Sequence, residues 1–372
     1  MEFRNDCDVY RDRSVRASWK VPAFCCNDWG ALKLLEICSA FGFERPFDLV
    51  YGAPHCSWSG GRPSAVRSPL DGGLIDAYFY AFAQFGVRCA LTFSKLAVDE
   101  KDYDNEYNNM LLDYVEKYDG QVILFDDGLA RYIKRSRPRI AIVASLNKAM
   151  CNLQDSRESE SDYYRDLFRL YDEVVVRSEY VLRDGWLDDL RDRRDSVEII
   201  VNQFCVPDCK HAFSHISELE EWSHRGCCGE GRPCYHLETA SCIESRLSEN
   251  LFISNRRISE LCSAGFTHMK IAGRNSPLPL FLDTLAEYIF EPTGVISHIK
   301  RAIVRDFKKE SMMGFEALFP FSIPKSVLKG LCSEVLFFLG YRDDGQRTPL
   351  LPPAEARGRA LCMHLRCCSR TN

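Results

Sequence analysis

Two cysteines follow a short apolar segment near the middle of the chain. Val197–Val201 has the composition of a buried strand, and Cys205 and Cys209 come soon after it, with His211 and His215 beyond. Thiolates and imidazoles are soft or borderline metal ligands, and a strand end can hold them close together. The sequence therefore predicts that this strand end carries chemistry.

Further cysteines follow within a short irregular stretch. They are Cys227, Cys228, Cys234 and Cys242. We expect a [4Fe–4S] cluster held by Cys205, Cys209 and two of these later cysteines. A zinc ion that uses His211 or His215 as a further ligand is the alternative. The third interpretation is that these cysteines are a surplus of thiols that bind no metal or cluster.

A second strand end carries two cations. Lys270-Ile-Ala-Gly-Arg274 closes an apolar segment, and the glycine between the cations allows close approach of a bound group. Lysine and arginine together bind phosphate or carboxylate groups well. The alternative is an ion pair at the rim of the fold, with Glu198 or Asp172 as the acid.

A glycine-rich loop provides another possible anion contact. Trp58-Ser-Gly-Gly-Arg62 follows the apolar segment at 47–53, and its paired glycines permit a close backbone approach. Arg62 could clamp a carboxylate there. The loop is not a P-loop because no Gly-Lys-Ser/Thr follows it, and a solvated arginine on a tight turn is the alternative. Ser94, Ser145 and Asn147 also follow strand candidates.

These residues need a scaffold that gathers strand ends. Seven apolar segments alternate with segments of helical periodicity: Phe47–Ala53, Gly86–Phe93, Gln121–Phe125, Arg139–Ala144, Glu173–Arg177, Val197–Val201 and His268–Ala272. This alternation favours parallel strands, and the count favours a TIM-like (β/α)8-type barrel, possibly incomplete, with its site at the C-terminal strand ends. A Rossmann sheet competes, but no G-x-G-x-x-G follows a strand.

The same pattern divides the chain. We expect an N-terminal extension over 1–45, a barrel domain over 46–292 with a cysteine-rich insertion at 217–251, and a helical, partly disordered extension over 293–372.

Composition limits the function classes. The chain has 372 residues, of which 46% are hydrophobic and 27% charged, and its formal net charge of −5 argues against a general nucleic-acid-coating role. Its 18 cysteines lack the setting of a disulfide framework, the N-terminus has no apolar leader, and no apolar run approaches the ~20 residues that span a bilayer. We expect reduced thiols, a cytoplasmic location and no membrane partner. Homo- and hetero-oligomers both stay open.

Two motifs carry a family resemblance. Glu198-Ile-Ile-Val-Asn-Gln-Phe-Cys-Val-Pro-Asp-Cys209 resembles the signature of the U32 peptidase-like family. Phe252–Ile258 with the following Gly265-Phe-Thr-His-Met-Lys-Ile-Ala-Gly-Arg274 is similar to that family's helix and the strand end after it. The resemblance spans roughly 47–274 and is weak before Glu198.

The resemblance implies a TIM-like barrel. Several members hold a [4Fe–4S] cluster through four cysteines and support oxygen-independent hydroxylation of RNA bases or of a quinone precursor, whereas others are collagenase-like peptidases. The resemblance assigns cluster ligation to Cys205 and Cys209. As third and fourth ligands we favour Cys234 and then Cys228, with Cys242 as the next candidate. Substrate contacts would come from Arg62, Glu198, Lys270 and Arg274.

The chain departs from the family pattern at two points. Asn202-Gln-Phe204 stands where members have His-Gly-Ala, and the later cysteine spacings differ. The sequence has no G-x-S-x-G elbow and no H-E-x-x-H. A peptidase, or a non-catalytic binding module stabilised by zinc or a cluster, therefore ranks behind a cluster-dependent modification of RNA or a small aromatic molecule.

Overall fold

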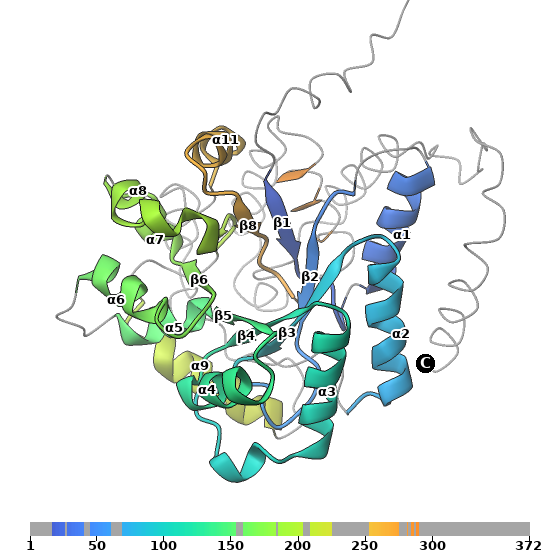
Figure 1. Ribbon diagram of the computed structural model, residues 1–372. Coiled ribbons are helices and arrows are strands. Elements are labelled where there is room, and N and C mark those ends of the chain that lie inside the picture. Colours follow the sequence, from blue (N-terminus) through green and yellow to red (C-terminus); the bar gives the residue numbers. More distant parts are fainter. Residues whose placement is uncertain are drawn as a thin grey trace, which may run out of the picture.

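The computed structural model describes residues 17–26, 28–40, 45–60, 69–153, 159–183, 185–203, 209–224 and 253–274, with 281, 284, 285, 288 and 289. Within this part of the chain, eight parallel strands form a closed barrel in which every strand pairs with its neighbours in sequence and the first pairs with the last (Figure 1). The strands are β1 (Ser18–Val21), β2 (Leu49–Gly52), β3 (Arg88–Phe93), β4 (Gln121–Leu124), β5 (Ala141–Ala144), β6 (Glu173–Val176), β7 (Val197–Ile200) and β8 (His268–Lys270).

Helices cover the outside of this barrel (Figure 1). They are α1 (Asp28–Ala40), α2 (Gly72–Ala83), α3 (Glu106–Lys117), α4 (Asp127–Ser136), α5 (Leu146–Asn152), α6 (Glu160–Leu167), α7 (Ser178–Val181), α8 (Trp186–Asp189), α9 (Ala212–His224) and α11 (Asn255–Ser263). Local sequence fixes many of their first residues, because a preceding Asp, Asn or Ser side chain accepts a hydrogen bond from a first-turn N–H. These caps are Asp71, Asn105, Asp126, Ser145, Ser159 and Ser254.

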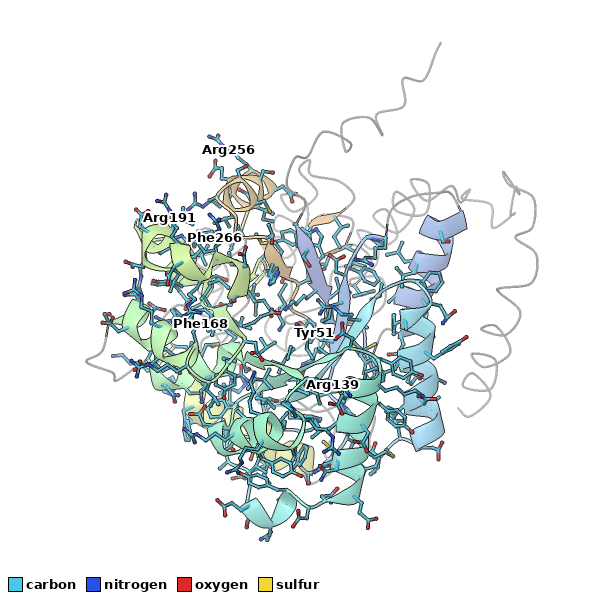
Figure 2. The ribbon with its side chains drawn as sticks, viewed as in Figure 1. Tyr51, Arg139, Phe168, Arg191, Arg256 and Phe266 are labelled. Carbon is cyan, nitrogen blue, oxygen red and sulfur yellow. The ribbon has the colours of Figure 1, made fainter. Side chains whose placement is uncertain are left out.

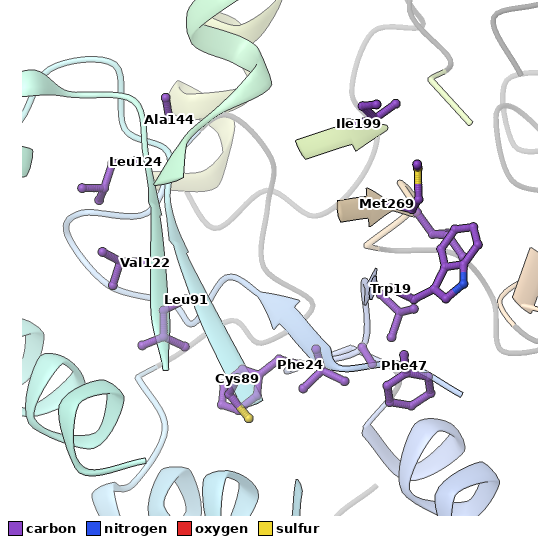
Figure 3. Close-up of a cluster of buried hydrophobic side chains, with 14 of the residues drawn as sticks. Trp19, Phe24, Phe47, Cys89, Leu91, Val122, Leu124, Ala144, Ile199 and Met269 are labelled. Carbon is purple, nitrogen blue, oxygen red and sulfur yellow. The ribbon is translucent and has the colours of Figure 1, made fainter. Parts of the chain in front are cut away.

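The strands bury side chains on both faces, which explains why most of them are rich in apolar residues. One set points outward and packs under the helices; Figure 3 shows Cys89, Leu91, Val122, Leu124 and Ile199 from this cluster. The alternate set points inward and forms a smaller cluster inside the barrel: Leu49, Tyr51, Ala90, Ile123, Val143, Val175 and Ile200. Strand alternation thus separates the core that stabilises the shell from the interior that leads to the site.

The barrel prediction is confirmed, and all seven predicted strands are present as β2 to β8. The barrel begins earlier than the sequence patterns indicated, because β1 and α1 lie inside the predicted N-terminal extension over 1–45. The strand β1 completes the closed barrel, pairing Lys20 with both Leu49 and Lys270.

Two other elements differ from the sequence expectation. Ser178–Asp189, one of the segments of helical periodicity between the predicted strands, forms two short helices, α7 and α8, because Gly185 adopts a positive φ of 84° between them. The predicted insertion at 217–251 begins as ordered helix, since α9 continues to His224. The extension over 293–372 lies outside the described residues. Among the helices that are described, none has the length and apolar character needed to cross a membrane.

Candidate anion-binding site at the barrel mouth

A cavity of about 90 Å³ opens at the C-terminal ends of the strands. This is well above the ~10–15 Å³ that one water requires, so the cavity has room for a small ligand group. Its walls come from the loops and strand ends of at least five barrel strands: Tyr51, Thr92, Ser94, Ile123, Ser145, Leu146, Asn147, Ile200, Gln203, Lys270, Ala272, Gly273 and Arg274. The cavity therefore lies where (β/α)8 proteins place their sites.

Lys270 is the buried cation of this cavity. Its Nζ donates a hydrogen bond to Glu198 Oε1 at 2.5 Å and lies 4.5 Å from the centre of the Tyr51 ring. Tyr51 is held in turn, since its hydroxyl donates to the carbonyl of Ile271 at 2.7 Å. Figure 2 shows Tyr51 among the barrel strands, far from the outer helix that carries Arg256. These contacts fix the ammonium group at the wall of the cavity.

The electrostatic setting makes this lysine easier to deprotonate than an exposed one. Burial lowers the pKa of Lys270, and the positive charges of Lys20 and Arg274 lower it further, while Glu198 opposes the change. The net direction is downward. An anion in the cavity would stabilise the protonated form, so anion binding and protonation of Lys270 must be coupled.

Glu198 lies directly beneath Lys270 and is fully buried inside the barrel. Its Oε1 accepts from Lys270, and its Oε2 forms an ion pair with Lys20 Nζ at 2.5 Å. Burial by itself would raise the pKa of Glu198, but the two lysines outweigh it and the pKa falls. Glu198 is therefore an ionised carboxylate shared by two ammonium groups.

Lys20 connects this pair to the other end of the barrel. Its Nζ also pairs with Glu173 and donates to Gln121 Oε1 at 3.3 Å. Burial alone would lower the pKa of Lys20, yet the carboxylates of Glu198 and Glu173 raise it. Glu173 also accepts from Gln121 Nε2 at 2.7 Å and lies 3.4 Å from His268 Nδ1. Burial would raise the pKa of Glu173, but Lys20 and His268 outweigh it and the pKa falls.

Neutral polar groups complete the cavity wall. Thr92 is 5% exposed, and its hydroxyl has no hydrogen-bond partner among the described residues. A buried hydroxyl without a hydrogen-bond partner lowers the stability of the fold. A ligand in the cavity that forms a hydrogen bond with Thr92 would therefore be bound more tightly. Gln203 is already engaged, since it accepts from Ser178 N–H and donates to Glu179.

Asn202 joins the end of β7 to the cation-bearing end of β8. Its side-chain oxygen accepts from the Ala272 N–H at 2.6 Å, and its amide group donates to the Ala272 carbonyl at 3.2 Å. This two-way bond joins the end of β7 to the residues that precede Arg274. Asn202 thus has a structural task at the mouth.

Cys209 lies close to the same end of the barrel. It is buried against Met150 and Ala212, which come from α5 and α9. Leu146 packs against this cluster and also lines the mouth cavity. The described residues contain no group of three or more His, Cys, Asp or Glu side chains that could hold a metal.

The predicted site residues fall into three groups. Lys270 and Arg274 line the cavity, together with Asn147, Ser94 and Ser145. Glu198 does not line it; the carboxylate orients Lys270 from below, as in the ion-pair alternative that the sequence left open. The third group neither lines the cavity nor orients its cations. In it, Cys209 packs against Met150 and Ala212, His211 precedes α9 and His215 lies within α9. Its other members lie outside the described part of the chain: Arg62, Cys205, Cys227, Cys228, Cys234 and Cys242.

Sequence reasoning missed three contributors, namely Lys20, Tyr51 and Thr92. A lysine placed between Trp19 and Val21 is the one local signal for Lys20. Tyr51 and Thr92 lie within predicted strands, and the inward side of a strand cannot be told from the outward side when both are buried.

Comparison with known proteins adds a likeness of fold. No family model and no curated protein matches the sequence. Among solved structures, the chain is similar to the U32 peptidase Mk0906, with a TM-score of 0.46 and 11% identity over 74% of this chain and 98% of that one. The fold class itself follows from the strand pairing: this chain is a closed, eight-stranded parallel barrel.

Proposed function

We propose that this chain is a U32-like barrel enzyme that binds a small anionic molecule, or an anionic part of an RNA, in the mouth of the barrel. The observation that carries the proposal is the placement of Lys270 and Arg274 on one cavity wall. The family motifs that end in these two residues and in Cys209 support the same placement of the site. The reaction we propose is an oxygen-independent hydroxylation or a related modification.

The residues at the mouth have separate tasks in this proposal. Arg274 and protonated Lys270 hold the anionic group, and the Thr92 hydroxyl forms a hydrogen bond with it. Glu198 and Tyr51 hold Lys270 in place. Apolar residues such as Ile123 and Ile200 line the inner wall and limit water around the ligand.

One described thiol suits the proposed [4Fe–4S] cluster. Cys209 is a soft ligand in a shielded position beside the cavity, and Cys205, Cys228 and Cys234 would have to supply the other three bonds. A bound cluster would supply one-electron chemistry next to the anion. Zinc held by the same thiols remains the competing metal.

The anion site is tested by calorimetric titration of the full chain with inorganic phosphate and with succinate. We expect Arg274→Gln and Lys270→Met each to weaken binding by about 10- to 100-fold, the loss of one charge-assisted hydrogen bond. The affinity of the wild-type protein for both anions should fall as the pH rises and Lys270 loses its proton. Because the pKa of Lys270 is lowered, this fall should begin at a lower pH than it would for a site that uses an exposed lysine.

A charge-matched control separates this from a general effect of charge. Arg139 lies before the first residue of β5, at the N-terminal end of that strand and so away from the mouth, and its side chain is 80% exposed. Arg139→Gln should leave the affinity for both anions unchanged. Equal losses in Arg139→Gln and Arg274→Gln, or no binding of either anion, would rule out the mouth as the site.

The cluster is tested by anaerobic purification with iron, sulfide and zinc analysis. We expect a broad absorbance near ~400 nm that falls below about a tenth of its wild-type intensity in Cys205→Ala/Cys209→Ala. Cys89→Ala is the control, because Cys89 is a buried core thiol on the outward face of β3 and should keep the iron. Stoichiometric zinc without iron in the wild-type protein would exclude the cluster.

A further inference from the structure

An alternating series of charges runs through the barrel interior from one end to the other. Glu173 begins β6 at the N-terminal end, and Lys20 on β1 and Glu198 on β7 follow. Lys270 ends β8 at the mouth, where it is the register partner of Lys20. Each member comes from a different strand and contacts the next member of the series. The Glu173 side chain is 12% exposed and Glu198 is 0% exposed, so the series leads inward from an end that meets solvent.

The two central members of this series each form ion pairs with two oppositely charged side chains. Glu198 divides its charge between Lys270 and Lys20, and Lys20 divides its charge between Glu198 and Glu173. In a buried setting such interactions are only weakly screened. A change of charge at one member must therefore alter the stabilisation of the next.

We propose that Glu173 and Lys20 are positioning residues for Lys270, which act through Glu198 and set the pH range over which the mouth presents a protonated ammonium group. The inference rests on the proposed anion site, where Lys270 is a ligand-binding residue. Neither Glu173 nor Lys20 is among the residues that line the described cavity.

The series gives the two residues opposite effects. Removing the charge of Lys20 leaves Glu198 wholly to Lys270 and removes a nearby positive charge, so the pKa of Lys270 should rise. Removing the charge of Glu173 leaves the positive charge of Lys20 without its second carboxylate, so the pKa of Lys270 should fall. The other groups that face Lys270, Tyr51 and Arg274, stay unchanged in both variants.

The test measures protonation of Lys270 directly, in the full chain without added anion. Lysine side chains are labelled with ¹³C and ¹⁵N, the Lys270 signal is assigned by its loss in Lys270→Met, and its shift is followed with pH. At a fixed pH, we expect the ratio of protonated to neutral Lys270 to rise roughly threefold or more in Lys20→Met and to fall by a similar factor in Glu173→Gln. Lys20→Arg keeps the charge and should stay near the wild type.

The outcomes are distinct. Shifts in the same direction, or no shift in Glu173→Gln, would overturn the inference; if Lys20→Met does not fold, Glu173→Gln and Lys20→Arg decide it alone. A purely structural role would lower stability without moving the titration of Lys270. Opposite shifts in a protein that binds neither phosphate nor succinate would refute the anion site and leave the charge series standing. Binding of either anion without these shifts would refute the charge series and leave the anion site standing.

Discussion

Glu198→Leu is expected to lower the free energy of unfolding at pH 7 by roughly 3–5 kcal/mol, the usual cost of removing one partner from a buried ion pair. The substitution leaves Lys270 buried without its carboxylate, and it leaves Lys20 with Glu173 alone. The measurement is urea unfolding followed by circular dichroism.

Two further variants show whether the loss comes from charge. Glu198→Leu/Lys270→Met removes both partners of one pair, and because apolar replacements of buried pairs are often neutral, it should recover a large part of the lost stability. Glu116→Gln breaks surface pairs with Arg137 and Arg139 and should cost less than about 1 kcal/mol. A double variant no more stable than Glu198→Leu would show that packing, and not the unpaired lysine, causes the loss.

Gly52→Ala is expected to lower the free energy of unfolding about as much as Glu198→Leu does, by roughly 3 kcal/mol or more, the cost of strong overpacking. A Cβ at Gly52 would lie 1.7 Å from the carbonyl oxygen of Phe24 and 2.6 Å from its carbonyl carbon. These are backbone atoms of the segment after β1, which the Phe24 N–H also ties to the Tyr51 carbonyl at 3.2 Å. Relief would require β1 and β2 to move apart at the mouth.

Gly73→Ala is the matched control. A Cβ there would meet only the Asp71 side-chain oxygen at 3.0 Å, and alanine favours the first turn of α2. Soluble yield and thermal unfolding should therefore separate the two alanine variants clearly. Equal stability in the two proteins would contradict the close approach of β1 and β2.

The two stability predictions bear on the site as well as on the fold. Gly52 adjoins Tyr51, whose ring faces Lys270, and Glu198 holds the same lysine from below. Variants that fold but loosen either contact should lose anion affinity before they lose the barrel. The mouth therefore depends on contacts that also close the fold.

Strand by strand, the sequence predicted most of the barrel. Segments such as Gln121–Phe125 and Val197–Val201 are apolar at all but one position because both faces of a parallel barrel strand are buried. The helix caps in the structure are local too, since side chains such as Asp126 and Ser159 each accept a hydrogen bond from an N–H in the first turn of the helix they begin. Lys270 and Arg274 were likewise found from a short motif at a strand end.

The strand β1 shows where this reasoning fails. Ser18-Trp-Lys-Val21 is short and carries a lysine, so it has no apolar run to detect. Its lysine is buried only because Glu173 and Glu198, more than 150 residues away in sequence, neutralise it inside the barrel. No local pattern encodes that distance.

The sequence by itself determined the barrel class, the order of seven strands and the two cations at the mouth, because periodicity and strand-end motifs are local properties. Only the tertiary structure decided that β1 closes the barrel, that Glu198 lies beneath the cavity instead of lining it, and that Tyr51 and Thr92 face the ligand space. Those outcomes depend on which strands meet and on which face of each strand turns inward, and both are settled when charges and side chains from distant segments are buried together.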